Sequence, residues 1–307
     1  MRVLITGAAG NLGSLLAKYL LANSDHGLNL MVHKKPLPDE LQRQARVHVY
    51  QCDLAERGTL TEVCRASDVI VHFAGVLFAP HPERFLPITN LQYTQHLVDA
   101  AIAQGVKRFI LISFPHVEGP TSCENPCTDR QDREPVSVHA KTRLAAERYL
   151  IRKASESGMR AIALRPGMIY GKEVLMIAFA KKLAQKKLLG VWGKPTPIHL
   201  LSIDDFHACC KATIESPTAQ GIYPLGDDDP ITLQEFLDVA CRRWGFGKPW
   251  RVPVWGVYLV AWMCEVLSAI SHTRTPFTVD FIRIGRVPYY CDTGRMKTDL
   301  LPRLKYS

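Results

Sequence analysis

The sequence predicts an α/β fold with a doubly wound parallel sheet and a small C-terminal lobe. Three observations predict it. A glycine-rich turn connects an apolar strand to an apolar helix at the start of the chain, and short β-branched runs then alternate with helical segments as far as residue 167. Such alternation is typical of parallel sheets whose helices cover both faces. Beyond residue 170 the hydrophobic periodicity is mixed, which indicates a separate lobe in a chain of 307 residues.

The first element is an apolar strand at residues 2–6 (RVLIT), followed at once by the glycine turn GAAGNLG and an apolar helix. Gly7 permits the tight turn, Gly10 lets the backbone approach a pyrophosphate, and Gly13 lets the helix pack on the strand. The N-terminus of the helix then offers N–H groups to phosphate. The turn therefore predicts a Rossmann-type dinucleotide site. Its expected cofactor-binding residues are Gly7, Gly10, Asn11, Leu12 and Gly13.

Five more apolar runs continue the alternation. Strands are expected at residues 28–33, 45–54, 68–75, 107–113 and 160–167, a long helix at 89–103, and another helix around HAKTR, residues 139–143. Parallel neighbours need crossover connections, so these runs are expected to form one parallel sheet. Ligands of such sheets bind outside the carboxyl ends of the strands, where the candidate site residues are expected.

The end of the second strand bears on the choice of dinucleotide. NAD-preferring proteins of this fold carry an acid there, which accepts hydrogen bonds from the ribose hydroxyls. This chain reads His33-Lys34-Lys35 at that place, with no acid before Asp39. Cations favour a 2′-phosphate, so we expect NADP, held in part by His33 and Lys34, with NAD as the alternative. A solvated lysine turn explains the same residues without a ligand.

Several ordered motifs together resemble the extended short-chain dehydrogenases/reductases, which include nucleotide-sugar epimerases and 3β-hydroxysteroid dehydrogenases. TGAAGNLG (6–13) is similar to the family's TGxxGxxG, LRPGMIYG (164–171) to its LRPxxxYG, and GIYPLGDDDPITLQEF (221–236) to the start of its substrate lobe. The resemblance covers nearly the whole chain and implies NAD(P)-dependent chemistry. Through the motifs CDL, HFAG and LRPG, it also places further residues at the cofactor: Asp53, Leu54, Phe73, Ala74, Gly75 and Pro166.

The catalytic pair departs from the family pattern. The family uses a Tyr and a Lys four residues apart, so that both side chains lie on one face of a helix. Glu147 matches the acidic residue usually found four positions beyond the Lys, and this register puts His139 at the Tyr and Arg143 at the Lys. A competing register pairs Ser137 with Lys141 and loses the match at Glu147.

A second departure lies near the end of the fifth strand, where the family has a Ser or Thr. That place falls on Phe114, which cannot polarise a carbonyl, whereas the neighbouring Ser113 or His116 can. Arg143 has five donors for ribose hydroxyls, and its fixed charge disfavours protonation of His139. We therefore expect an altered active site with His139 as general base, Arg143 as cofactor clamp and Ser113 as a weak orienting group.

Three hypotheses for function follow. The favoured one is NADP-dependent redox or isomerising chemistry on a small apolar alcohol or ketone, because both replacements stay polar and keep their four-residue spacing. The second is a non-catalytic NAD(P)-binding scaffold or redox sensor, in which His139 is only a half-exposed helix residue. The third is a non-redox reaction with His139 as base and a purely structural dinucleotide.

The C-terminal half is expected to form the substrate lobe. Amphipathic helices are predicted at 175–190 and 233–245. We expect residues 1–171 to be mainly the NAD(P)-binding Rossmann domain and residues 172–307 mainly the substrate lobe, with about 199–225 returning to the Rossmann domain.

Residues 252–270, VPVWGVYLVAWMCEVLSAI, are the most apolar segment. No charge occurs before Glu265, and three aromatic residues are interleaved. The uncharged run is too short to cross about 30 Å of hydrocarbon. It is either a buried helix of the lobe or a peripheral membrane contact with aromatics at the interface. A similar apolar helix occurs in the hydroxysteroid-dehydrogenase branch, and that resemblance implies an apolar small-molecule substrate.

Charge and cysteine usage exclude other classes. The net charge of +9 is not gathered in a run, so no nucleic-acid partner is predicted. The nine cysteines form no metal-type pair, which predicts no metal and free thiols in a reducing compartment. A strand that begins at Arg2 leaves no room for a leader and favours the cytoplasm, with membrane association through 252–270 as an addition. The family resemblance also implies a homodimer.

Overall fold

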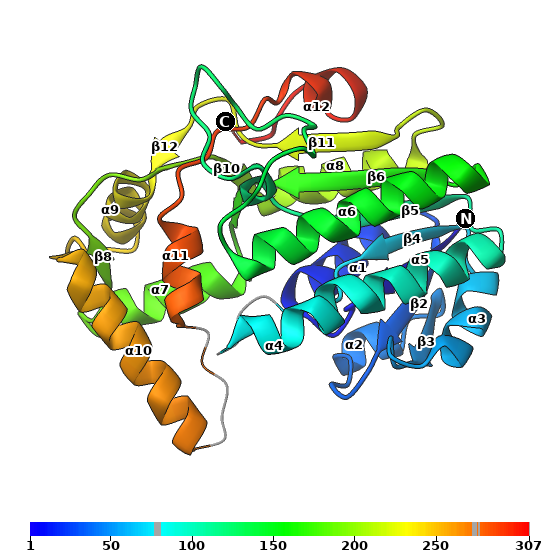
Figure 1. Ribbon diagram of the computed structural model, residues 1–307, viewed down its shortest axis with the longest axis horizontal. Coiled ribbons are helices and arrows are strands. Elements are labelled where there is room, and N and C mark those ends of the chain that lie inside the picture. The colour runs from blue at the N-terminus through cyan, green and yellow to red at the C-terminus, as the bar shows by residue number, and fades with distance from the viewer. Residues whose placement is uncertain (77–80, 272–274, 276, 307) are drawn as a thin grey trace.

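The computed structural model describes residues 1–76, 81–271, 275 and 277–306. Its centre is a seven-stranded parallel sheet in the order β11-β6-β5-β4-β1-β2-β3 (Figure 1). The strands are β1 (Arg2–Thr6), β2 (Gly27–Val32), β3 (Val47–Gln51), β4 (Val69–His72), β5 (Arg108–Ile112), β6 (Arg160–Pro166) and β11 (Gly221–Leu225). The predicted fold class, a Rossmann-type doubly wound sheet, is confirmed.

Helices cover both faces of this sheet because its central strands are apolar on both sides. Val3 and Ile5 of β1 belong to one buried cluster and Leu4 to the other, as the two-residue period of a strand requires. α1 and α8 pack in the first cluster, and α3, α5 and α6 in the second. The helices around the sheet are α1 (Asn11–Asn23), α2 (Asp39–Gln42), α3 (Arg57–Arg65), α4 (Pro82–Leu86), α5 (Tyr93–Ala103), α6 (Val138–Ser157), α8 (Ile203–Glu215) and α12 (Gly294–Asp299).

The strand order reverses between β1 and β4, and this places a crevice at their carboxyl ends. Two strands end sooner than the sequence predicts, since β3 stops at Gln51 and β4 at His72. Asp53 and Gly75 consequently lie in the loops that follow these strands. The loops, rather than the strands, carry the residues expected at the cofactor.

The helix expected at 89–103 begins differently. A π-helical segment, η1 (Pro87–Gln92), precedes α5, and its Asn90 is buried. The Asn90 amide donates to the Val76 carbonyl at 2.9 Å, and its Oδ1 accepts from the Val76 N–H at 2.8 Å. These bonds to the loop after β4 connect the helix to the site, and π-helical turns are frequent near functional sites.

The C-terminal lobe has its own apolar cluster around Trp192, Leu237 and Val257. Small sheets pair β7 with β10, β9 with β12 and β8 with β13. The lobe elements and short segments are η2 (Pro115–Glu118), β7 (Met168–Tyr170), α7 (Leu175–Gln185), β8 (Gly190–Trp192), β9 (Pro197–Ile198), β10 (Leu200–Ser202), β12 (Ile231–Thr232), α9 (Leu233–Arg243), β13 (Trp250–Val252), α10 (Val254–Ile270) and α11 (Val279–Gly285).

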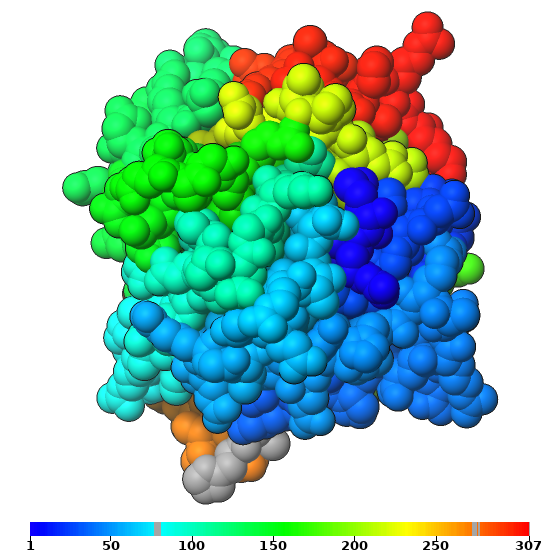
Figure 2. Space-filling view, turned by 90° about the vertical axis from the view of Figure 1, so that its right-hand side faces the viewer, coloured from blue at the N-terminus to red at the C-terminus, as the bar shows by residue number. Residues whose placement is uncertain are grey.

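α10 contains most of the apolar segment 252–270, and the expectation that it is a buried helix is wrong for one of its sides. Trp255 is 71% exposed and Trp262 is 57% exposed. The end of α10 extends beyond the rest of the molecule in both views (Figures 1 and 2). Within the described part of the chain, no helix has the length and hydropathy needed to cross a bilayer.

Candidate active site

The glycine turn has the close contacts that its sequence predicts. Gly7 has a φ of +69°, and a Cβ there would lie 2.9 Å from the Ala74 backbone nitrogen. A Cβ on Gly13 would lie 2.5 Å from the Gly7 carbonyl oxygen, so the helix and the turn touch only because both residues are glycine. α1 begins at Asn11 with no side chain capping its N-terminus. Its first N–H groups are therefore suited to a pyrophosphate.

Asn11 also connects the turn to the second lobe. Its side-chain amide donates to the Glu173 carbonyl at 2.8 Å, and its Oδ1 accepts from the Leu175 N–H at 2.8 Å. The Asn11 side chain is thus engaged with the start of α7, and its backbone N–H is the group that remains suited to phosphate.

The residues expected at the adenine end of the dinucleotide follow two neighbouring strands, β2 and β3. His33 Nε2 lies 3.3 Å from Asp53 Oδ2, and Lys34 beside it is exposed. Asp53 also accepts a hydrogen bond from the Ala55 N–H at 2.9 Å, which fixes its loop, and the Leu54 carbonyl lies 3.1 Å from the His96 ring. The structure therefore gathers the predicted residues His33, Lys34, Asp53 and Leu54 at one end of the crevice.

At the other end, Gly75 makes room for Arg143. A Cβ on Gly75 would lie 3.0 Å from Arg143 Nη2 and 3.1 Å from Asn90 Oδ1. Arg143 is only 6% exposed, and its Nη1 has no hydrogen-bond partner among the described residues. Burial lowers the pKa of Arg143 to about 10, although Glu147 acts against this, so Arg143 stays charged at neutral pH. A buried cation with a free donor is suited to ribose hydroxyls.

His139 lies inside the molecule, on the face of α6 that turns toward the sheet. It is 2% exposed, so the alternative that treats it as a half-exposed helix residue is wrong. Its ring stacks on Phe114 with centroids 4.7 Å apart and planes at 20°. Burial, then the charge of Arg143 and then His116 lower the pKa of His139 to about 3. The imidazole is consequently neutral at physiological pH.

The competing register on α6 consists of a capping residue and an exposed lysine. Ser137 is the N-cap of the helix, and its hydroxyl accepts from the Ala140 N–H at 3.1 Å. Lys141 is exposed to solvent. The pair His139 and Arg143 is therefore the one that faces the crevice, four residues apart as the sequence predicts.

Ser113 and His116 surround Phe114 on the loop after β5. Within the part of the chain that the structure describes, the buried Ser113 hydroxyl has no hydrogen-bond partner, and neither ring nitrogen of His116 makes a hydrogen bond of good geometry. Burial lowers the pKa of His116 to about 4. The Tyr289 ring from the C-terminal segment lies 4.6 Å from the His116 ring. Sequence reasoning missed Tyr289, because it assigned no chemistry to the C-terminal segment that contains this residue.

A buried ion network supports the two elements that carry these residues. Arg165 at the end of β6 donates to Glu118 at 2.5 Å and to Glu147 of α6 at 2.6 Å. It also donates to the carbonyls of Thr128 and Arg130 at 3.1 and 3.0 Å. Arg165 thus joins β6, α6, η2 and the loop that leads into α6. The sequence signals only part of this network, through the Arg of its LRPG motif.

The buried polar atoms near the glycine turn indicate what the crevice can bind. Among the described residues, the Ser113 hydroxyl, both ring nitrogens of His139 and Arg143 Nη1 all lack hydrogen-bond partners. An unsatisfied buried group costs about 1–3 kcal/mol, so such groups in one place indicate a polar ligand. The hydroxyls of a nicotinamide ribose and one substrate oxygen have the donors and acceptors that these atoms lack. The residues therefore fit a dinucleotide.

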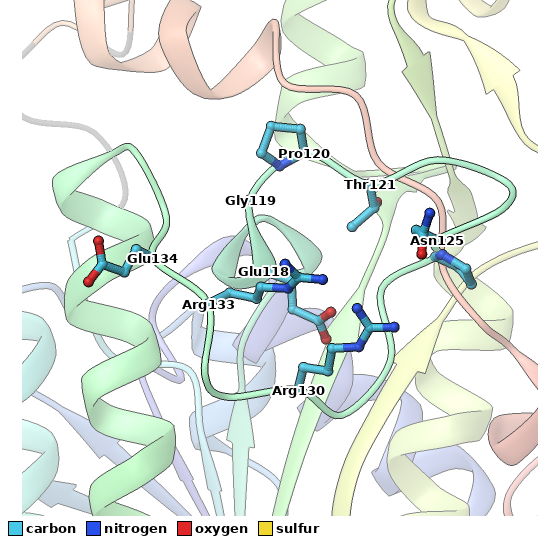
Figure 3. Close-up of a pocket in the computed structure, with 9 residues that line it drawn as sticks. Glu118, Gly119, Pro120, Thr121, Asn125, Arg130, Arg133 and Glu134 are labelled. Atoms are coloured by element: carbon cyan, nitrogen blue, oxygen red, sulfur yellow. The ribbon is translucent and has the colours of Figure 1, made fainter.

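A hollow of about 470 Å³ lies at the outer side of Glu118 (Figure 3). Arg130 and Arg133 extend toward it, and Thr121 and Asn125 line its other side (Figure 3). Neither His139 nor Arg143 lines it, so it is separate from the catalytic candidates. The sequence predicts no metal site. The described residues contain no group of three or more His, Cys, Asp or Glu side chains placed to hold a metal ion.

Solved structures share this fold at low sequence identity. UDP-glucuronic acid 4-epimerase from Bacillus cereus, in complex with UDP-glucuronic acid and NAD, matches with a TM-score of 0.78 and 18% identity over 100% of this chain and 95% of that one. UDP-glucose 4-epimerase from Thermotoga maritima, with UDP-glucose, has a TM-score of 0.75 and 17% identity over 97% and 92% of the two chains. The Bordetella bronchiseptica enzyme WbmG, in complex with NAD, has a TM-score of 0.74 and 19% identity over 98% and 87%.

Residues 3–226 match the family model described as "NAD dependent epimerase/dehydratase family". The match spans the glycine turn, the loop after β4, the helix that carries His139 and the LRPG motif. The resemblance to extended short-chain dehydrogenases/reductases is therefore confirmed, and this chain belongs to the NAD dependent epimerase/dehydratase family.

Proposed function

We propose that the protein is an NAD(P)-dependent oxidoreductase or epimerase-type enzyme that acts on a small apolar alcohol or ketone. One observation carries the proposal: His139 and Arg143, at the positions that the resemblance gives to the catalytic pair, and Ser113, next to Phe114, all have buried polar atoms without a hydrogen-bond partner among the described residues. Gly75 lets Arg143 approach the loop after β4, and the glycine turn packs against the same loop.

The chemistry assigned to His139 follows from its environment. When bound, the nicotinamide would supply hydride transfer. With a pKa lowered to about 3, His139 is neutral and has no proton to spare for acid catalysis at pH 7. Its imidazole instead accepts a hydrogen bond from the substrate hydroxyl and orients it. We propose that His139 takes the hydroxyl proton, that Arg143 holds the ribose and that Ser113 orients the substrate oxygen.

The apolar character of the substrate is supported by the ring cluster around the site. Phe114 occupies the position where the family has a hydroxyl, and it stacks on His139. Tyr289 adds a second aromatic wall beside His116. These groups offer little to the sugar hydroxyls of a nucleotide sugar, whereas an apolar ketone or alcohol packs against rings of this kind.

A second candidate function is a non-catalytic NAD(P)-binding scaffold or redox sensor. The depressed pKa of His139 favours it, because a base with a pKa of about 3 is weak. Non-redox chemistry with His139 as base is the remaining alternative.

We also propose a Rossmann domain at 1–171 with a substrate lobe at 172–307, a cytoplasmic location and a homodimer. Light scattering tests the homodimer.

The His139→Ala variant tests the enzyme proposal. Turnover with a panel of ketosteroids, terpenoid ketones and nucleotide sugars, followed by nicotinamide absorbance, is expected to fall about 10²–10⁴-fold. Dinucleotide affinity is expected to stay unchanged in His139→Ala and to fall in Arg143→Met. Lys141→Ala, on the exposed side of the same helix, is the matched control. Undiminished turnover in His139→Ala would remove this residue from the mechanism, and tight dinucleotide binding without turnover favours the scaffold.

The Lys34→Ala variant tests the proposed preference for NADP. Lys34 and Lys35 are exposed beside His33, where a 2′-phosphate would lie. Loss of one charge-assisted contact to phosphate is expected to weaken NADP binding about tenfold while NAD binding stays the same. Lys107→Ala, at the other end of the sheet, is the control. Asp53 beside His33 could instead accept from ribose hydroxyls, and tighter binding of NAD than of NADP to the wild-type protein would refute the proposed preference.

A further inference from the structure

One side of α10 is a continuous apolar surface. Eight large side chains on it are between 38% and 72% exposed: Trp255, Leu259, Val260, Trp262, Met263, Val266, Leu267 and Ile270. They recur every three or four residues, so they lie along one side of the helix. The opposite side packs into the lobe through Val257 and Ala261. A helix that is apolar on all sides is normally buried all round, and this one is covered by protein only on one side.

The exposed side of α10 carries no charge. Glu265 is the only charged residue in the helix, and its carboxylate turns back to accept the Val279 N–H at 2.9 Å. A continuous face of exposed, large apolar side chains is uncommon on a monomeric protein and marks an interaction surface. The surface has no exposed carboxylate to offer a partner.

Lysines gather next to this face at the end of α7 and the turn after it. Lys181, Lys182, Lys186 and Lys187 are all exposed, and none takes part in a salt bridge among the described residues, unlike nearby Arg251, which pairs with Asp238 at 2.8 Å. The sequence from Leu175 to Gly190 contains no acidic residue that could neutralise them.

A hydrogen bond joins the lysines to the start of α10. The indole of Trp250 in β13 donates to the Lys187 carbonyl at 2.9 Å, and β13 leads directly into α10. Trp250 and Leu188 are each 66% exposed. Exposed lysines and an exposed tryptophan thus lie near the start of the uncharged apolar helix.

We propose that this surface docks on an anionic lipid bilayer. The apolar side of α10 would enter the boundary between headgroups and acyl chains, while the lysines contact lipid phosphates. α10 has 17 residues, about 25 Å of helix, and one of its sides is already held by the lobe, so it lies on the bilayer. A second copy of this chain is the poorer partner, because its identical surface offers the lysines no carboxylate. The end of α10 is well placed for this contact, since it projects beyond the rest of the molecule (Figures 1 and 2).

Flotation of the full-length protein with phosphatidylcholine vesicles, with and without phosphatidylglycerol, tests the proposal. We expect binding to the anionic vesicles and weaker binding to phosphatidylcholine alone. The double variant Trp262→Gln, Leu267→Gln is expected to lose at least about tenfold in affinity for both. The variant Lys186→Gln, Lys187→Gln is expected to lose about tenfold for anionic vesicles only. Val49→Gln, an exposed apolar residue on β3, is the matched control and is expected to bind like the wild type.

Three results would overturn the proposal. One is no binding to either kind of vesicle, and another is unchanged binding by Trp262→Gln, Leu267→Gln. The third is a wild-type dimer in light scattering that this double variant converts to monomers, which would assign the surface to a second copy. Dinucleotide affinity and urea unfolding show that each variant is folded. Because the nucleotide site lies in other residues, failure of vesicle binding is distinguishable from failure of the proposed enzyme activity.

Discussion

Replacing Arg165 by Met is expected to destabilise the folded protein by about 3–5 kcal/mol, because it leaves two buried carboxylates without their cation. The Arg165 side chain has no solvent exposure, and those of Glu118 and Glu147 have 1% and none. Its guanidinium holds both carboxylates and two loop carbonyls together. Urea unfolding followed by circular dichroism measures the change.

A companion variant separates the loss of the Arg165 contacts from the cost of the unpaired carboxylate charges. Changing Glu118 and Glu147 to Gln in the Arg165→Met background removes the unpaired charges, so it is expected to recover part of the lost stability. Arg148→Met is the matched control, since Arg148 is exposed and bonds only to loop carbonyls. An Arg165→Met protein as stable as the wild type would mean that the network does not hold β6 and α6 together.

Lowering the pH from 8 to 5.5 is expected to cost about 5–6 kcal/mol of folding stability through four buried histidines. Burial lowers the pKa of His72 and of His139 to about 3, and the pKa of His116 and of His207 to about 4. The unfolded chain takes up these protons below pH 6.5, whereas the folded chain does not until pH 3–4. Stability is therefore complete above pH 6.5 and is lost as the pH falls, by about 1.4 kcal/mol for each histidine at pH 5.5.

Asp227 opposes this trend weakly. Burial and then Asp205 raise the pKa of Asp227 to about 6, so its folded form gains a proton as the pH falls through 6 and stabilises the fold by less than about 1 kcal/mol at pH 5.5. Thermal or urea unfolding at several pH values measures the sum.

His207→Gln provides a direct check of the histidine contribution. His207 lies on α8 against the Tyr19 ring, away from the candidate active site. The variant is expected to remove about one quarter of the histidine effect while leaving dinucleotide affinity unchanged. A variant whose stability has the same pH dependence as the wild type would contradict the assignment to buried histidines.

Local sequence determined the fold class and the nucleotide end of the site. The first turn needs glycine at positions 7, 10 and 13, because a Cβ at Gly7 or Gly13 would touch backbone. Such a requirement is visible in the residue types alone. The alternation of apolar runs with helices likewise predicts the parallel sheet, since period two and period 3.6 are properties of short segments. The four-residue spacing of His139 and Arg143 put both on one helix face for the same reason.

Other features depend on contacts between distant parts of the chain. The stacking of Phe114 on His139 joins the loop after β5 to α6, and it is this burial that sets the low pKa of the imidazole. Tyr289 reaches His116 from the C-terminal segment. Arg165 selects two glutamates from two different elements. Sequence periodicity says which face of an element is apolar, but it does not say which partner covers that face.

α10 shows most clearly what the sequence predicts and what only the tertiary structure determines. Its composition alone established an uncharged apolar helix with interleaved aromatics, and left open whether the lobe or a membrane covers it. Only the tertiary structure decided that Val257 and Ala261 face the lobe while Trp255 and Trp262 face outward. The physical reason is that the hydrophobic effect has no direction. It favours the burial of apolar surface in general, and the packing of the rest of the chain determines which side of the helix is buried and which side stays exposed.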